Sequence, residues 1–203
     1  MKLDPPVIGI LRGISADFFG PLMDAAFESG LQAIEVTLNT AQAEAMIAAQ
    51  RPRVPEGKLL GMGTIRNLEE AKRALDAGAM FLVSPNTDER LIDFAVSRDI
   101  PVVAGALTPT EVYRAWACGA ALVKVFPCTQ LGPEYIKDLL GPFDQIPLAA
   151  VGGINKENVN AYFKAGAKAV GVGSSLFGRQ AIECKQADQI SANVKNFLGL
   201  ILK

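Results

Sequence analysis

Eight short runs of apolar, often β-branched residues alternate along the chain with longer segments that have helix start and stop signals. Apolar runs of this length are typical of parallel strands buried on both faces. Polar caps open the helical segments and glycines close them, as Ser15 and Gly30 do around residues 16–29. The pattern predicts strands at residues 7–12, 33–38, 59–64, 81–85, 101–106, 122–127, 147–153 and 169–174.

The chain also carries an internal repeat, in which a helix ends, a glycine follows and a strand begins. The repeat glycines are Gly30, Gly78, Gly119 and Gly166, which lie 48, 41 and 47 residues apart. One repeat for every two strand–helix units fits a barrel with four-fold quasi-symmetry. We therefore predict an α/β protein, a single (β/α)8 TIM barrel in one domain over residues 1–203. The alternative that uses the same alternation is a doubly wound open sheet.

Composition excludes several functional classes. The chain has no histidine, so Ser-His-Asp and Cys-His catalysis are excluded, and its three cysteines have no metal-type spacing. A net charge of −1 gives no basic excess for nucleic acid, and no apolar run is long enough to span a membrane. We expect a cytoplasmic protein with no metal and neither a nucleic-acid nor a membrane partner.

The repeat also serves as a ruler along the even-numbered strands. Five residues after each repeat glycine come Glu35, Val83, Lys124 and Gly171. In a TIM barrel, four side chains from alternate strands form one interior layer. The sequence therefore predicts that an acid and a lysine share a layer in which branched apolar residues are expected.

A lysine in the barrel interior favours chemistry over structure. Burial lowers the pKa of a lysine, and a neutral amine is a nucleophile at neutral pH. Lys124 would then form a Schiff base with a carbonyl substrate, and Glu35 would move protons. The structural alternatives are a buried ion pair, or side chains that point outward into the interface between barrel and helices.

Two glycine-rich turns predict an anion site. Gly152 and Gly153 end the seventh strand, and Gly173 and Ser174 end the eighth. The loops after strands 7 and 8 form the recurrent phosphate site of this fold, because backbone N–H groups can approach the anion there. The alternative is a pair of tight turns that bind nothing.

Two further side chains end strands at the same rim of the predicted barrel. Arg12 ends the first strand, where its guanidinium could hold a carboxylate or phosphate, or could simply be solvated. Thr64 ends the third strand after two glycines and offers one hydroxyl, a weak signal by itself.

The order of short motifs resembles one family. The chain is similar to the 2-keto-3-deoxy-6-phosphogluconate (KDPG) aldolases, which include 6-phosphogalactonate and 4-hydroxy-2-oxoglutarate aldolases. The similarity runs from about Val7 to Phe177. The motifs that carry it are Glu35-Val36-Thr37-Leu38, Gly61-Met62-Gly63-Thr64, Ser84-Pro85-Asn86, Thr108-Pro109-Thr110-Glu111, Lys124-Val125-Phe126-Pro127, Gly132-Pro133, Val151-Gly152-Gly153-Ile154 and Gly171-Val172-Gly173-Ser174.

The resemblance implies a role for each matching residue. Lys124 matches the Schiff-base lysine and Glu35 the general acid–base. Thr64 matches a residue that contacts the pyruvate part of the substrate, and Pro85 lines the site. The phosphate would be bound by Gly152, Gly153, Gly173 and Ser174. The family needs no cofactor besides the covalent lysine imine, contains no metal and is typically trimeric.

One position departs from the pattern of the family. KDPG aldolases usually carry Glu-x-Thr-x-Arg-Thr, and that arginine binds the substrate carboxylate. This chain has Asn39 at that position, which resembles the phosphogalactonate branch. Asn39 is predicted to lie in the substrate site, with Arg12 supplying the missing positive charge.

The predicted reaction is cleavage of a phosphorylated 2-keto-3-deoxy sugar acid, gluconate or galactonate, to pyruvate and glyceraldehyde 3-phosphate. The configuration at C4 is left open, and the alternative substrate within the family is 4-hydroxy-2-oxoglutarate, which has no phosphate. Outside it, a phosphosugar isomerase or epimerase could use the same phosphate loops, and a non-catalytic barrel could bind a phosphorylated ligand.

Overall fold

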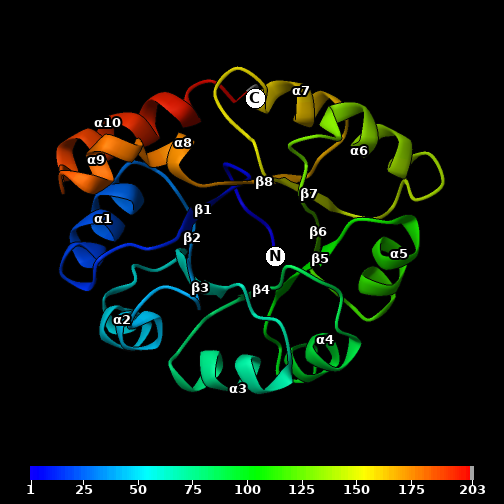
Figure 1. Cartoon of the computed structure of the whole chain (residues 1–203), viewed down its shortest axis with the longest axis horizontal. Coiled ribbons are helices and arrows are strands. Elements are labelled where there is room, and N and C mark those ends of the chain that lie inside the picture. The colour runs from blue at the N-terminus through cyan, green and yellow to red at the C-terminus, as the bar shows by residue number, and fades with distance from the viewer. Residues whose placement is uncertain (202–203) are drawn as a thin grey trace.

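The computed structural model describes residues 1–201, in which eight parallel strands close into a barrel in the order β1 to β8. Strand β1 pairs with both β2 and β8, which closes the ring. Helices surround the ring on its outside (Figure 1). The predicted TIM barrel is therefore confirmed, and the open sheet is excluded. The strands are β1 (Val7–Leu11), β2 (Ala33–Thr37), β3 (Leu59–Gly63), β4 (Leu82–Val83), β5 (Val102–Ala106), β6 (Leu122–Val125), β7 (Leu148–Val151) and β8 (Ala169–Val172).

The helices follow the strands in regular alternation, with three after β8. Their bounds are α1 (Ala16–Glu28), α2 (Ala43–Gln50), the 3-10 helix η1 (Arg51–Arg53), α3 (Leu68–Asp76), α4 (Glu89–Val96), α5 (Pro109–Ala117), α6 (Gly132–Leu140), α7 (Val159–Lys164), α8 (Ser174–Phe177), α9 (Arg179–Glu183) and α10 (Ala187–Leu198). The sequence also predicts helix caps at Asn67 and Thr108, and both have the expected hydrogen bonds. Asn67 accepts from the Glu70 amide, and Thr108 forms a capping box with Glu111.

Apolar burial has two parts, as a barrel requires. One cluster lies between the strands and the surrounding helices. The other fills the amino-terminal half of the barrel interior with Ile8, Ala33, Phe81, Val83, Val103, Leu122, Ala149 and Ala169. Met1 and Leu3 pack against this interior cluster, and the N-terminus lies near the centre of the ring (Figure 1). Because these side chains fill the amino-terminal half of the interior, we expect a ligand to bind at the carboxyl ends of the strands.

The predicted elements are right in kind but too long at some ends. β4 ends before Ser84, whose hydroxyl accepts the Gly105 amide in place of a backbone carbonyl. The sequence predicts a helix over residues 156–165, but α7 begins at Val159, because the Asn155 side chain accepts from the amides of Glu157 and Asn158 and forms a turn before the helix. It also predicts a last helix over about residues 185–202. α10 begins at Ala187, after Lys185, whose backbone is left-handed (φ 54°), and residue 202 lies outside the described residues.

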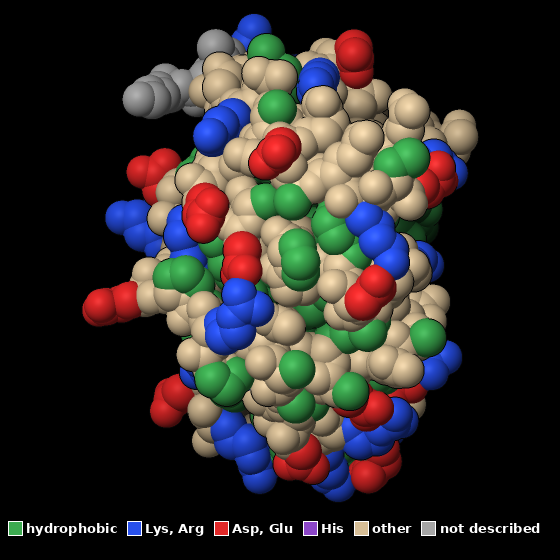
Figure 2. Space-filling model, turned by 90° about the vertical axis from the view of Figure 1, so that its left-hand side faces the viewer, with side chains coloured by type: hydrophobic (Ala, Val, Ile, Leu, Met, Phe, Trp, Pro, Cys, Tyr) green, Lys and Arg blue, Asp and Glu red, His purple; other side chains and the backbone are tan. Residues whose placement is uncertain are grey.

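The molecular surface mixes charges of both signs. Figure 2 shows the face that α1, α2, α9 and α10 cover, where Lys and Arg side chains intermingle with Asp and Glu. On this face Arg53 pairs with Asp24, and Lys185 pairs with Asp17. No helix within residues 1–201 has the length and apolar character that crossing a membrane requires.

The four repeat glycines share one conformation, which explains the repeat. Gly30, Gly78, Gly119 and Gly166 have φ of 101°, 96°, 91° and 104°. Each follows a helix and turns the chain toward the next even-numbered strand, a conformation that L side chains rarely adopt.

Gly30→Ala is expected to destabilise the protein by about 1–2 kcal/mol. A Cβ there would lie 3.7 Å from Leu198, an ordinary contact, so the cost comes from φ alone. The measurement is urea unfolding beside Gly199→Ala, whose native φ of −65° suits alanine. Equal stability of the two variants would contradict this explanation of the repeat.

Candidate active site

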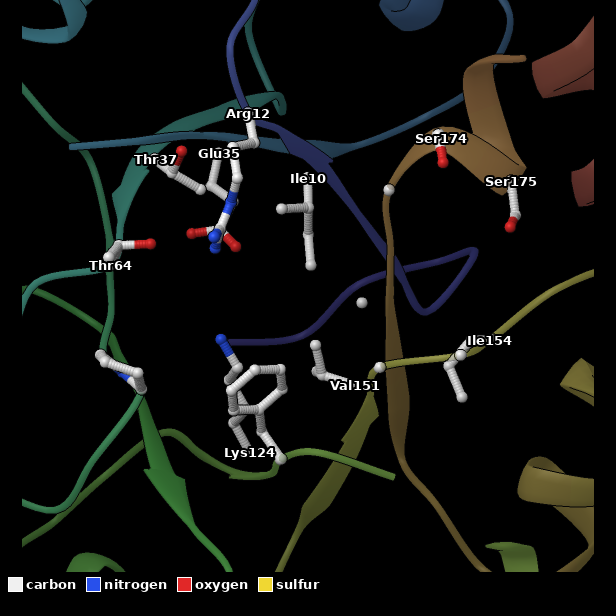
Figure 3. Close-up of a pocket in the computed structure, with 16 residues that line it drawn as sticks. Ile10, Arg12, Glu35, Thr37, Thr64, Lys124, Val151, Ile154, Ser174 and Ser175 are labelled. Atoms are coloured by element: carbon white, nitrogen blue, oxygen red, sulfur yellow. The ribbon is translucent and has the colours of Figure 1, made fainter. Parts of the chain in front are cut away.

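A cavity of about 520 Å³ opens at the carboxyl ends of the strands. It brings together every residue predicted for the site except Asn39. Figure 3 shows Arg12, Glu35, Thr64 and Lys124 at one end of it, and Ser174 and Ser175 at the other. The lining residues are Ile10, Arg12, Glu35, Thr37, Thr64, Pro85, Lys124, Phe126, Val151, Gly152, Gly153, Ile154, Gly171, Gly173, Ser174 and Ser175.

The layer predicted from the repeat lies inside the barrel. Val83 belongs to the interior cluster, while Glu35, Lys124 and Gly171 line the cavity just above it. The side chains of Glu35 and Lys124 point toward one another from β2 and β6 (Figure 3). The alternative in which they point outward is therefore wrong.

The carboxyl group of Glu35 is buried from solvent, and one of its oxygens has no hydrogen-bond partner among the described residues. It is 1% exposed, and its Oε2 has no partner among the described residues. Burial raises the pKa of Glu35 to about 7, although the positive charges of Lys124 and Arg12 act in the opposite direction. A carboxyl with this pKa can both give and take a proton near neutral pH.

A glycine on the neighbouring strand makes room for this carboxyl. A Cβ on Gly63 would lie 1.5 Å from the Glu35 Oε2, so no other residue at position 63 is compatible with this placement of the carboxyl. One function of the Gly61-Met62-Gly63-Thr64 motif is thus to leave space for the Glu35 carboxyl at position 63.

Lys124 is almost fully buried, at 7% exposed. Burial lowers the pKa of Lys124, and so does the charge of Arg12, while the charge of Glu35 acts in the opposite direction. Its Nζ lies 4.9 Å from the centroid of the Phe126 ring, and within residues 1–201 it forms no ion pair closer than 4 Å. The surroundings thus favour the neutral, nucleophilic amine.

The opposite end of the cavity is built from backbone. Gly152 and Gly153 have φ of 100° and 74°, and a Cβ on either would press on Cys128 or Thr129 at 3.2 or 3.1 Å. α8 begins at Ser174, and the Leu176 amide donates to the Gly173 carbonyl, so the amides of Ser174 and Ser175 are the ones without an acceptor in the helix. These two loops can therefore present N–H groups to an anion.

Thr64 lies at the cavity in a strained conformation. Its φ is 60°, which is unusual for a β-branched residue and costs about 1–3 kcal/mol. Strain of this kind persists where the surrounding structure imposes it, often at functional sites.

Asn39 lies elsewhere. It is exposed in the turn after β2 and does not line the cavity, whereas Thr37 does. The lining residues that sequence reasoning missed include Ile10, Thr37 and Phe126, each two positions from a predicted residue. Strand alternation was the signal that could have found them.

The described residues contain no group of three or more His, Cys, Asp and Glu side chains placed to hold a metal ion. The chemistry that this cavity offers comes from an amine, a carboxyl, a guanidinium and backbone amides.

Comparison with known proteins agrees with the geometry. The family model described as KDPG and KHG aldolase matches residues 3–193. The chain belongs to this aldolase family. It is 35% identical to 2-dehydro-3-deoxy-6-phosphogalactonate aldolase of Escherichia coli over 195 residues, which covers 95% of this chain and 94% of that protein.

Solved structures of aldolases also resemble the barrel. A native KDPGal structure superposes with a TM-score of 0.89 at 33% identity and covers 98% of both chains. KDPG aldolase from Legionella pneumophila, with pyruvate captured at low pH as a covalent carbinolamine, has a TM-score of 0.87 at 27% identity. That match covers 95% of this chain and 93% of the other. The protein is an aldolase, a carbon–carbon lyase.

Glu35→Gln is expected to change how stability depends on pH. The folded pKa of about 7 exceeds the ordinary value of 4.5, so the folded state holds the extra proton between these pH values. The contribution of Glu35 to the free energy of unfolding is therefore fully present below pH 4.5 and falls by about 3 kcal/mol as the pH rises to 7. Relative to Glu35→Gln, the wild type should weaken over this range.

The measurement is urea unfolding of both proteins from pH 4 to pH 8. Glu56→Gln, which removes an exposed carboxyl, is the matched control. A constant difference between wild type and Glu35→Gln across this range would show that the buried carboxyl keeps an ordinary pKa.

Proposed function

We propose that the protein is a class I aldolase that cleaves 2-keto-3-deoxy-6-phosphogalactonate to pyruvate and glyceraldehyde 3-phosphate through a Schiff base on Lys124. The observation that carries the proposal is the placement of Lys124 and Glu35 in one cavity, with both pKa values displaced toward neutrality by burial. A ligand-binding barrel has no need of two such groups.

In this mechanism the neutral Lys124 amine attacks the C2 carbonyl of the substrate. Glu35 supplies the proton with which the carbinolamine loses water to become an iminium. The Glu35 carboxylate then takes the proton of the C4 hydroxyl as the C3–C4 bond breaks. The bonding electrons move to C3 and the iminium becomes an enamine, while glyceraldehyde 3-phosphate leaves. Protonation at C3 and hydrolysis release pyruvate and regenerate Lys124.

The two ends of the substrate are held by opposite ends of the cavity. Arg12 binds the carboxylate, and Thr64 and Pro85 line the space around the pyruvate part. Gly152, Gly153, Gly173 and Ser174 bind the phosphate through their backbone amides, with the Ser174 hydroxyl. These contacts are remote from the breaking bond and fix its position relative to Lys124 and Glu35.

The galactonate configuration is supported by the relatives and by Arg12. The Escherichia coli relative at 35% identity is a phosphogalactonate aldolase. Asn39 stands where KDPG aldolases usually carry the carboxylate-binding arginine, and Arg12 lines the cavity instead.

We further propose that the aldolase is a cytoplasmic homotrimer. Exposed apolar side chains lie on and around α5 and α6, notably Leu107, Tyr113 and Leu131. The Tyr113 ring lies 6.0 Å from that of Phe143, so this aromatic surface extends past α6. A surface of this kind is typical of a contact between subunits.

Borohydride reduction with pyruvate present tests the Schiff base. We expect mass spectrometry to find a reduced pyruvate adduct on the Lys124 peptide. Lys124→Met should form no adduct and should lose at least about a thousandfold in kcat, because the nucleophile is absent. The variant should fold, since methionine fits a buried site, and circular dichroism checks this. A folded wild type without adduct at excess pyruvate would contradict the mechanism.

Substrate choice is tested by pyruvate release from the two phosphorylated epimers and from 4-hydroxy-2-oxoglutarate. We expect the highest kcat/KM for the galactonate. Arg12→Ala should raise KM about 10- to 100-fold with a smaller change in kcat, because a charged hydrogen bond to the carboxylate is lost. Unchanged kinetics of Arg12→Ala would refute the role of Arg12, and a preference for the gluconate would refute the assigned configuration.

A further inference from the structure

Two buried threonine hydroxyls beside the cavity have no part in the mechanism so far. Thr37 and Thr40, at the end of β2 and in the turn that follows, are 1% and 5% exposed. Their Oγ1 atoms lie 3.0 Å apart, within hydrogen-bonding distance. The amide of Gly13 donates to the Thr40 Oγ1 at 2.9 Å. This chain of hydrogen bonds crosses from the β2–α2 turn to the loop after β1.

The residue before Gly13 is Arg12. Leu11 of β1 pairs with Val36 of β2, so the residues that follow them, Arg12 and Thr37, lie beside each other at the carboxyl ends of the two strands. Both line the cavity. Figure 3 shows Arg12 and Glu35 on the side of the cavity that Lys124 faces, and the charge of Arg12 opposes the rise that burial causes in the pKa of Glu35. Arg12 is exposed and forms no ion pair within the described part of the chain, and the Thr40 hydroxyl holds the amide of the residue that follows it.

The Gly13 amide donates to the Thr40 hydroxyl, and either threonine hydroxyl can donate to the other, since each has one hydrogen and two lone pairs. Thr37 in turn is fixed by β2, which is paired on both sides. The loop after Arg12 is thus attached through two hydroxyls to a rigid strand.

We propose that Thr40, supported by Thr37, is a positioning residue that holds Arg12 at the cavity of the Lys124–Glu35 pair to bind the carboxylate of the substrate. The proposal rests on the proposed aldolase function. Asn39 lies between the two threonines in the chain but is exposed outside the cavity. In this proposal the turn that contains it contributes to carboxylate binding by holding Arg12, and the Asn39 side chain makes no contact with the carboxylate.

A purely structural role predicts something different. If Thr40 only stabilised the turn, its loss would weaken all carbonyl ligands alike, or would change only thermal stability. If it positions Arg12, its loss should affect ligands that carry a carboxylate and spare those without one. Pyruvate and hydroxyacetone provide this contrast, because both are small methyl ketones and only pyruvate has a carboxylate.

The experiment measures borohydride-trapped adduct on Lys124 as a function of ketone concentration. The full-length proteins are wild type, Thr40→Val, Thr40→Ser, Thr37→Val, Arg12→Ala and the double variant Thr40→Val/Arg12→Ala. Thr110→Val, at an exposed threonine of α5, is the matched control for the substitution itself. Thermal unfolding shows that each variant is folded at the assay temperature.

We expect Thr40→Val to raise the half-saturating pyruvate concentration roughly tenfold and that of hydroxyacetone less than about twofold. Thr37→Val should act in the same direction, and Thr40→Ser should restore wild-type values because it keeps the hydroxyl. The double variant should bind pyruvate no worse than Arg12→Ala alone, since the two residues act through one contact.

Equal losses for the two ketones, or losses for Thr40→Val and Arg12→Ala that multiply, would overturn the positioning role. If Thr40→Val failed to fold, Thr37→Val and Thr40→Ser would decide the question on the same ratio. A wild type that traps neither ketone would instead overturn the aldolase mechanism, and the role of Arg12 with it.

Discussion

The site depends on burying an amine and a carboxyl in the same layer of the barrel. Desolvation favours the neutral form of both, and their mutual attraction favours the charged form of both. Here burial is the larger effect, since the pKa of Glu35 rises to about 7 and that of Lys124 falls. The groups are also not in direct contact as an ion pair within 4 Å, which limits their attraction. A tight salt bridge would have given a stable but inert pair.

The barrel accommodates this layer by leaving out side chains. Gly63 leaves space for the Glu35 carboxyl, and a Cβ on Gly171 would lie 2.9 Å from Val151 and 3.0 Å from Ile10. On β5, a Cβ on Gly105 would lie 2.3 Å from the backbone of Pro85. These glycines thus let neighbouring side chains and backbone approach closely at the carboxyl-terminal end of the barrel, while residues such as Phe81 and Leu122 fill the amino-terminal end. Function sets the composition of one half, and packing sets that of the other.

The sequence predicted the fold well because strand alternation and the repeat glycines report local backbone requirements. The predicted positions of Lys124 and Glu35 followed from the same repeat, since a fixed offset from a glycine fixes which way a strand residue points. Asn39 has the same strand parity as Glu35 and Thr37, but β2 ends at Thr37 and the chain turns before residue 39, so alternation no longer applies and Asn39 lies outside the cavity. Thr40 could not be found, since its role depends on Gly13, 27 residues away, and on a turn that brings their atoms together.

In the proposed mechanism, Arg12 makes one carboxyl serve as both acid and base. In the free enzyme its charge lowers the pKa of both Glu35 and Lys124. A substrate carboxylate bound to Arg12 cancels part of this charge, so Glu35 becomes more protonated when the carbinolamine needs a proton. The iminium that follows carries a permanent positive charge close to Glu35, which lowers the pKa of the carboxyl again. Glu35 is then ionised when the C4 hydroxyl must lose its proton. The change from the neutral carbinolamine to the charged iminium on Lys124 thus sets the protonation state of Glu35. A correctly placed Arg12 links substrate binding to the first proton transfer, because it is the substrate carboxylate that cancels its charge.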